Sequence, residues 1–405
     1  MNSPTERQLR PQSFAVVIAI LITIAVVAGL LLSRLGHRTN IPAQPPPSGE
    51  RDYGPPPQGV ALIYVIDPRN YAWLQAYDWQ GNPRGTVKLA PPFDAQSRSI
   101  RMAPDGSAFL VDQGGKGASA YLDRLGRPIP GPGPAPGTVA AMWADDNQHL
   151  CLVGLDKQTN EWSLSTQLPG QSPKRVAVIA RDQAVGQSAI SVVGCSFLNE
   201  RAILVRTTVA WPSELWAVSL ADARVLYHEA ITSNTLASVA ASPDARLIAE
   251  SSALSGPNGG YGAPPATGIL SLDLGGRWLK SLTAYWQVLR FSGDASRVLV
   301  TTRFDDGQRP SPLAIEDLAL DKVVWKYSGA ESLYSSIAQP GGKDFALALR
   351  EPTRFIPSGC GVASGAREGP SPTPCSAVED ALRDIVILHP HGTTTAIPGR
   401  YLTVW

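Results

Sequence analysis

From Val60 to the end of the chain, short apolar runs alternate with turns rich in Gly, Pro, Asp and Asn. Each run has the length of a β-strand, and no stretch keeps a 3.6-residue apolar period long enough to predict a major helix. The pattern therefore predicts an all-β domain that covers residues 60–405.

The runs form a repeat of two alternating hairpins. In the first kind, a Pro, Asp or Gly turn separates two apolar strands, as at residues 99–111 and 237–249. Looser copies of this hairpin lie at residues 139–153, 190–205, 288–301 and 335–349. Successive turns are roughly 41 to 53 residues apart, which is the spacing of four-stranded β-propeller blades.

In the second kind of hairpin, a strand of alternating polar and apolar residues is followed by a turn and another strand, as at residues 215–227 and 313–325. It has one more copy than the first kind. If each blade has strands a to d, the first hairpin is a–b and the second is c–d. Residues 60–90 then supply strands b, c and d, and the missing strand a is the end of the chain, 401–405. This pairing would close the ring and leave no open sheet edge. We predict a seven-bladed propeller, with six or eight blades as alternatives.

The N-terminal region has a different pattern. Residues 13–33 carry no charge and consist mainly of Ala, Val, Ile and Leu. A helix of about 20 apolar residues spans the hydrocarbon core of a bilayer, so we predict a transmembrane helix at 13–33 after a short polar tail at 1–12. A cleaved signal peptide is the alternative, although its apolar core is usually shorter.

Residues 34–59 are rich in proline and contain two runs of three prolines. Such a segment favours an extended polyproline II conformation and acts as a spacer. We interpret it as a stalk between the helix and the propeller. Basic residues flank the helix on both sides, so their distribution does not determine its orientation.

The four cysteines bear on the cellular compartment. Cys360 and Cys375 lie in a Gly-, Pro- and Ser-rich insertion that has little apolar surface to order it. A disulfide between them would contribute about 3 kcal/mol in the chain-entropy model, and we predict this bridge. Because disulfides persist in oxidising compartments, we expect a single-pass membrane protein with an extracytoplasmic propeller. Cys151 and Cys195, on neighbouring blades, are expected to be buried free thiols.

Composition and motifs exclude several classes of function. The 35 Lys and Arg nearly balance the 34 Asp and Glu, so no basic excess exists to bind the phosphates of a nucleic acid. The cysteines and histidines lack the spacing of a zinc site, and we predict neither a metal nor a cofactor. No nucleophile elbow, P-loop or H-E-x-x-H motif is present.

Two turns and one hairpin resemble known repeats. Ala103-Pro104-Asp105-Gly106 and Ser242-Pro243-Asp244-Ala245 resemble the Ser-Pro-Asp-Gly turn of TolB-like and WD-repeat-like propellers. Residues 313–325 resemble the pyrroloquinoline-quinone-type repeat, in which a C-terminal aromatic residue, here Trp325, docks against the next blade. The resemblance implies the fold and carries almost no information on function.

Three long connections follow the second strands of successive blades, at residues 252–267, 304–311 and 351–383. They should lie side by side on one face of the ring, and long loops on a rigid scaffold are frequent binding sites. The candidate contact residues are Tyr261, Asp305, Asp306, Arg309, Arg354 and Phe355. Asp305 and Asp306 lack the further oxygen ligands of a calcium loop.

These features predict a membrane-anchored, extracytoplasmic binding or scaffold module rather than an enzyme. Its partner on the long-loop face would be an envelope protein, a peptide or a polysaccharide. One alternative is a propeller enzyme, such as a hydrolase, lactonase or quinoprotein-like enzyme, with a site at the channel mouth. Another is a sensor or accessory subunit of a larger membrane complex. Acidic or His side chains around an ion in the channel would favour the enzyme.

Overall fold

The computed structural model describes residues 53–66, 73–89, 100–111, 119–135, 137–183, 188–208, 213–231, 238–252, 266–282, 287–301, 313–327, 332–350, 382–398 and 401–402. All of them belong to one compact unit, Asp52–Trp405. The other unit, Met1–Arg51, lies outside the described residues, and so do the predicted tail and transmembrane helix. Among the described residues, no helical segment has both the length and the hydropathy of a membrane span.

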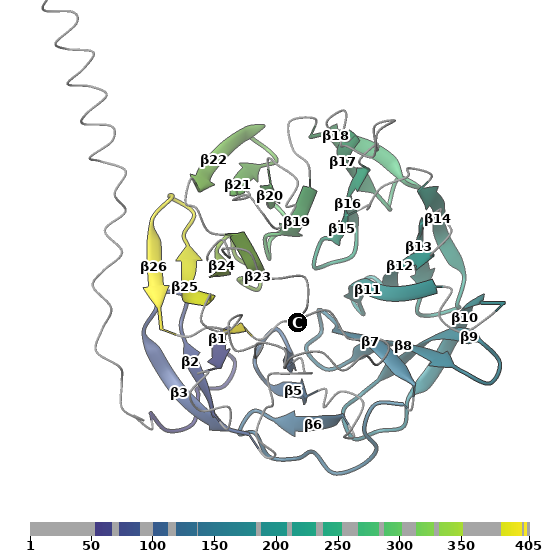
Figure 1. Cartoon of the computed structure of the whole chain (residues 1–405), viewed down its shortest axis with the longest axis horizontal. Coiled ribbons are helices and arrows are strands. Elements are labelled where there is room, and N and C mark those ends of the chain that lie inside the picture. The colour runs from purple at the N-terminus through teal and green to yellow at the C-terminus, as the bar shows by residue number, and fades with distance from the viewer. Residues whose placement is uncertain are drawn as a thin grey trace, which may run out of the picture. The chain divides into compact units, whose positions relative to one another are not determined.

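The described residues of this unit form seven antiparallel sheets around a common axis (Figure 1), so the fold is the predicted seven-bladed β-propeller. The first blade contains β27 (Tyr401–Leu402), β1 (Ile63–Ile66), β2 (Trp73–Tyr77) and β3 (Pro83–Lys88). The second contains β4 (Ile100–Met102), β5 (Ala108–Val111) and β6 (Ala120–Asp123). The third contains β7 (Thr138–Trp143), β8 (Leu150–Asp156), β9 (Glu161–Gln167) and β10 (Lys174–Arg181).

The remaining four blades follow in chain order. The fourth contains β11 (Ser188–Ser196), β12 (Arg201–Thr208), β13 (Ser213–Ser219) and β14 (Val225–Ile231). The fifth contains β15 (Ser238–Ala241), β16 (Leu247–Ser252), β17 (Ala266–Ser271) and β18 (Arg277–Ser281). The sixth contains β19 (Gln287–Phe291), β20 (Arg297–Thr301), β21 (Leu313–Asp317) and β22 (Lys322–Tyr327). The seventh contains β23 (Ser332–Ala338), β24 (Phe345–Arg350), β25 (Leu382–Leu388) and β26 (Thr394–Ile397).

The ends of the propeller meet in the first blade. β27 pairs antiparallel with β1, with Val65 opposite Leu402 and Ile66 opposite Tyr401. Strand a of this blade therefore comes from the C-terminal end of the chain and strands b to d from its beginning, as the unequal numbers of the two hairpins predicted. The last three residues of the predicted closing strand, 403–405, lie outside the described residues.

Apolar side chains on both faces of each sheet hold neighbouring blades together. All five residues of β20 are buried, as expected for a strand covered on both faces. One core cluster joins the first and second blades, where the rings of Tyr64 and Phe109 meet edge to face with centroids 5.2 Å apart. Another joins the seventh blade to the first and includes Ile387 and Val65. The core is thus a ring of contacts between blades.

Trp325 on β22 packs as its resemblance to the quinoprotein-type repeat implies. Its partly buried side chain lies against a cluster shared by the sixth and seventh blades, which includes Leu313, Phe345 and Leu388. The aromatic residue of one blade therefore docks on the next.

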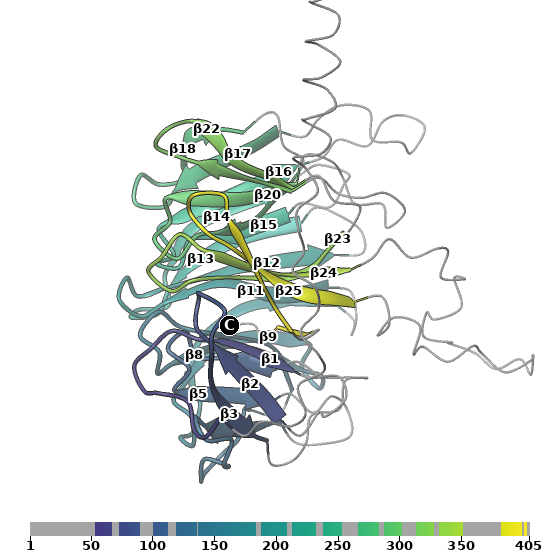
Figure 2. The same ribbon diagram turned by 90° about the vertical axis from the view of Figure 1, so that its left-hand side faces the viewer.

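The strands run between two faces of the propeller (Figure 2). The a–b and c–d turns lie at one end, and we call this end the turn face. It includes residues 103–107, 144–149, 197–200, 242–246, 292–296 and 339–344. The b–c and d–a connections leave from the other end, which we call the connection face. It includes the strand ends at Ser252, Ala266, Thr301, Leu313, Arg350 and Leu382.

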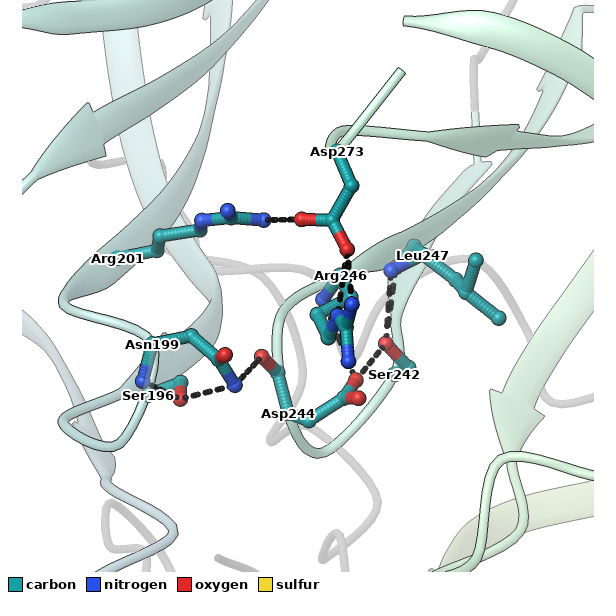
Figure 3. A network of polar contacts seen from close by, with 8 residues as sticks. All are labelled: Ser196, Asn199, Arg201, Ser242, Asp244, Arg246, Leu247 and Asp273. Carbon is teal, nitrogen blue, oxygen red and sulfur yellow. Dashed lines mark hydrogen bonds and ion pairs between the residues drawn. The ribbon is translucent and has the colours of Figure 1, made fainter. Parts of the chain in front are cut away.

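Polar contacts between successive turns reinforce the turn face. Between the fourth and fifth blades, the Asn199 side-chain amide donates to the Asp244 carbonyl oxygen at 2.9 Å (Figure 3). Asp273 forms ion pairs with Arg201 of the fourth blade at 2.7 Å and with Arg246 of its own blade at 2.5 Å. Each turn is therefore held partly by its neighbour.

The last part of the predicted stalk packs on the propeller. The Thr86 amide on β3 donates to the Gly54 carbonyl oxygen at 2.8 Å, and the Arg124 guanidinium donates to the Pro56 carbonyl oxygen at 2.9 Å. A Cβ atom on Gly85 would lie 2.6 Å from the Pro56 nitrogen, so only glycine permits this close approach. The segment covers part of the outer edge strand, which limits edge-to-edge association.

A disulfide links Cys151 on β8 to Cys195 on β11, with the Cα atoms 6.0 Å apart. The prediction of two free thiols at these positions is wrong. The two residues are 44 positions apart in sequence and become neighbours because the third and fourth blades pack face to face within one core cluster. The predicted bridge between Cys360 and Cys375 lies outside the described residues.

We expect the Cys151–Cys195 disulfide to stabilise the propeller by about 3–4 kcal/mol, because it closes a long loop in the unfolded chain. Unfolding in urea should be measured with Cys360 and Cys375 replaced by Ser, so that one bridge remains possible. We call this double-Ser variant the parent. Adding Cys151→Ala and Cys195→Ala to the parent should lower the urea midpoint. Dithiothreitol should lower the midpoint of the parent and leave that of the fourfold variant unchanged. A parent midpoint that does not respond to dithiothreitol would contradict the bridge.

Candidate functional site

The six predicted contact residues all lie outside the described residues. They are Tyr261, Asp305, Asp306, Arg309, Arg354 and Phe355. The strands that bound their segments are described, and they are strands b and c of the fifth, sixth and seventh blades. The three connections therefore start and end on the connection face of successive blades. The contact roles of the six residues stay predictions.

On the same face of the propeller, ionisable side chains gather at the connection-face end of the fourth blade. Arg206 on β12 lies opposite Glu214 on β13, and its Nη1 is 2.9 Å from Glu214 Oε2. Its Nη2 is 2.7 Å from Oδ1 of Asp182, which follows β10 of the third blade. His228 on β14 extends the group, with Nε2 3.7 Å from Glu214 Oε1. We call these four residues the charge cluster.

Asp182 is the buried anion of the charge cluster. Its carboxylate accepts hydrogen bonds from Trp162 Nε1 at 2.9 Å, from Ser188 Oγ at 2.6 Å and from Arg206. Burial acts to raise the pKa of Asp182, but the hydrogen bonds outweigh this effect and hold the pKa below its ordinary value. The charge is compensated, so the cluster joins the third and fourth blades.

Glu250 on β16 has no comparable compensation. It lies two residues before the end of the strand at Ser252, is 6% exposed, and its Oε2 has no hydrogen-bond partner among the described residues. Burial and, to a smaller extent, the charge of Glu229 on β14 raise the pKa of Glu250 to about 7. Tyr227 donates its hydroxyl to Glu229. Glu250 can therefore hold or release a proton near neutral pH.

Sequence analysis did not identify Glu250 or the charge cluster. The one signal for Glu250 is a carboxylate within an otherwise apolar and small-residue strand, Leu247–Ser252. Buried acids with a raised pKa occur at functional sites and also in structural networks. Within the part of the chain that the structure describes, no group of three or more His, Cys, Asp or Glu side chains could hold a metal ion.

Comparison with known proteins extends to the fold alone. No protein-family model and no curated protein matches the chain. Hydrazine synthase of Kuenenia stuttgartiensis is similar with a TM-score of 0.50 at 13% identity, over 76% of this chain and 96% of that chain. The likeness places the chain among the β-propellers.

Two other solved structures have lower TM-scores, and the match covers a smaller share of each of those chains. A structure from a study of two prolyl endopeptidases has a TM-score of 0.48 at 11% identity, over 85% of this chain and 50% of that chain. The chain thus spans about half the length of that structure. A TolB-type protein from Agrobacterium tumefaciens has a TM-score of 0.37 at 10% identity, over 64% of this chain and 79% of that chain.

We expect Glu250→Gln to stabilise the propeller at about pH 8 by up to about 3 kcal/mol and to have little effect near pH 4. The folded state raises the pKa of Glu250 from 4.5 to about 7. The folded state therefore binds more protons than the unfolded state between these values, and wild-type stability falls as pH rises through this window. The amide side chain of the variant cannot ionise, so the substitution removes this cost. Urea unfolding between pH 4 and pH 8 measures the difference.

Two further variants serve as controls. Glu229→Gln removes a charge that raises the pKa of Glu250. The pH range over which stability falls should therefore lie lower in this variant than in the wild type. Glu200→Gln, at an exposed position on the turn face, should leave the profile unchanged. Parallel pH profiles for wild type and Glu250→Gln would show that Glu250 is not perturbed.

Proposed function

We propose that this chain is a membrane-anchored binding or scaffold module. Its propeller would lie outside the cytoplasm and receive an envelope protein, a peptide or a polysaccharide on the connection face. The observation that carries this proposal is that three long connections begin at the same face of three successive blades. They begin at the strand ends Ser252, Thr301 and Arg350. A rigid ring can present adjacent loops as one continuous surface.

The residue types in the three connections favour a protein or peptide as the partner. Tyr261, Phe355, Arg309 and Arg354 belong to the classes that are enriched at protein interfaces, and Arg and Tyr frequently dominate the binding energy. On the same face, the charge cluster adds the half-exposed side chain of His228. A polar partner of mixed charge suits this surface.

Two further observations support an anchored, extracytoplasmic propeller. The disulfide between Cys151 and Cys195 belongs to the core between two blades, and structural disulfides persist in oxidising compartments. The apolar segment 13–33 has the length of a membrane-spanning helix. The prolines that follow would hold the propeller away from the bilayer.

The direct test is site-specific photocrosslinking in intact membranes. A photoreactive phenylalanine analogue at Tyr261 or Phe355 should give a discrete crosslinked product. The same analogue at Leu198, which is 76% exposed on the turn face, should not. Digestion of the product with a protease or a glycosidase distinguishes a protein from a polysaccharide.

Charge-removing variants sharpen the same experiment. Arg309→Ala with Arg354→Ala should lower the yield of the product several-fold, because Arg residues are common energetic centres of interfaces. Arg277→Ala, at an exposed position on the outer strand β18, is the matched control and should leave the yield unchanged. Equal crosslinking from the turn face and the connection face would overturn the proposal.

A further inference from the structure

The turn face contains a cavity of about 340 Å³ around the axis of the ring. Residues from the second to the seventh blade line it, and they lie on the inner strands or in the a–b turns. This cavity is at the opposite end of the strands from the connections discussed above. Its volume lies in the range of small-molecule sites.

The wall of the cavity is largely apolar. Met142 lines it from β7, Leu198 from the a–b turn of the fourth blade, and Pro243 and Pro340 from the a–b turns of the fifth and seventh blades. This wall can accommodate the apolar part of a ligand.

Arg290 on β19 is the cation of the cavity lining. Its side chain is half-buried, and its Nε is buried with no hydrogen-bond partner among the described residues. The register of β19 shifts between Val288 and Arg290, and such a bulge redirects a side chain. Burial lowers the pKa of the Arg290 guanidinium to about 10, so it still carries its charge at neutral pH.

Two other partly buried cations of the propeller have carboxylate partners. Arg206 pairs with Asp182 and Glu214, and Lys280 lies 2.7 Å from Glu316. Within the described ranges, Arg290 makes no such pair. A buried donor such as the Arg290 Nε is costly when it has no acceptor, and a ligand in the cavity can supply that acceptor.

Three carboxylates also line the cavity, but each is bonded within the turns. Asp145 accepts from Ser196 Oγ at 2.6 Å and from the Phe197 amide at 2.8 Å. Asp244 accepts from Ser242 Oγ at 2.5 Å (Figure 3), and Asp294 accepts from Ser292 Oγ at 2.7 Å.

These carboxylates hold the turns in place and leave the guanidinium as the available charged donor. The cavity therefore combines apolar walls, one cation that makes no ion pair with a described residue, and three carboxylates whose hydrogen bonds hold them within the turns.

We propose that the axial cavity binds a small organic carboxylate with an apolar body, through an ion pair with Arg290 and apolar contacts with Met142 and Leu198. The guanidinium group matches the two oxygens of a carboxylate. Inorganic phosphate is a poor fit, because the apolar wall offers it no further partners. This site is separate from the connection face and would make the propeller a receptor for a small molecule as well.

The experiment compares phenylacetate with phenylacetamide, which has nearly the same shape and no charge. Binding to the full-length protein in detergent is followed by calorimetry or ligand-observed NMR. Phenylacetate should bind saturably and at least about tenfold more tightly than phenylacetamide, since a charge-assisted hydrogen bond is stronger than a neutral one. Inorganic phosphate at the same concentrations should not compete with phenylacetate.

Arg290→Met should abolish the preference for the acid and leave the weak binding of the amide unchanged. Arg277→Met, on the exposed outer strand, should behave like wild type. Arg290→Lys keeps a charge but cannot form the two parallel hydrogen bonds, so it should retain a reduced preference. Equal binding of acid and amide to the wild type, a preference that survives Arg290→Met, or no saturable binding would overturn the proposal.

Stability separates a ligand-binding role from a structural one. Without ligand, Arg290→Met should unfold in urea at the wild-type midpoint or above it, because the variant removes a buried donor, the Arg290 Nε, that has no partner among the described residues. Phenylacetate should raise the wild-type midpoint and leave that of Arg290→Met unchanged. If Arg290→Met instead lowers the midpoint as much as Arg206→Met does, Arg290 has a structural role and the proposal is wrong.

Discussion

The pairing of β27 with β1 closes the ring, and the packing of every blade depends on this closure. Each sheet buries apolar side chains on both faces, and each core cluster that joins two blades needs both of them. An open ring would expose two apolar faces and an unpaired inner edge at the first blade. Two residue pairs, Val65 with Leu402 and Ile66 with Tyr401, connect the ends.

Closure gives the propeller two faces with different properties. On the turn face, short turns are bonded to their neighbours, as between Asn199 and Asp244, and they surround a preformed axial cavity. At the connection face lie the strand ends that bound the long connections of three successive blades, and also the charge cluster and Glu250. A rigid propeller with short turns on one face and long connections starting from the other suits a binding module. The Cys151–Cys195 disulfide adds a covalent link between the third and fourth blades.

The sequence predicted the fold because the evidence for it is local. Turn residues such as Pro104 and Asp244 recur at the spacing of a blade, and an unequal number of hairpins indicates that the chain ends pair. The Cys151–Cys195 bridge was missed because it depends on which side chains face each other across two blades. Glu250 and Arg290 were missed because single charged residues within apolar strands form no motif, and their burial is a property of the assembled ring.

Truncation of the full-length chain after Arg400, with hydrogen exchange of the remaining protein, tests the closure most directly. Closure through β27 requires that the loss of residues 401–405 lowers the midpoint of urea unfolding and accelerates amide exchange in β1 and in the seventh blade, whose cores meet there. Exchange in β12 and β13, on the far side of the ring (Figure 1), should change least. A truncated chain with the wild-type midpoint and unchanged protection of β1 would contradict the account.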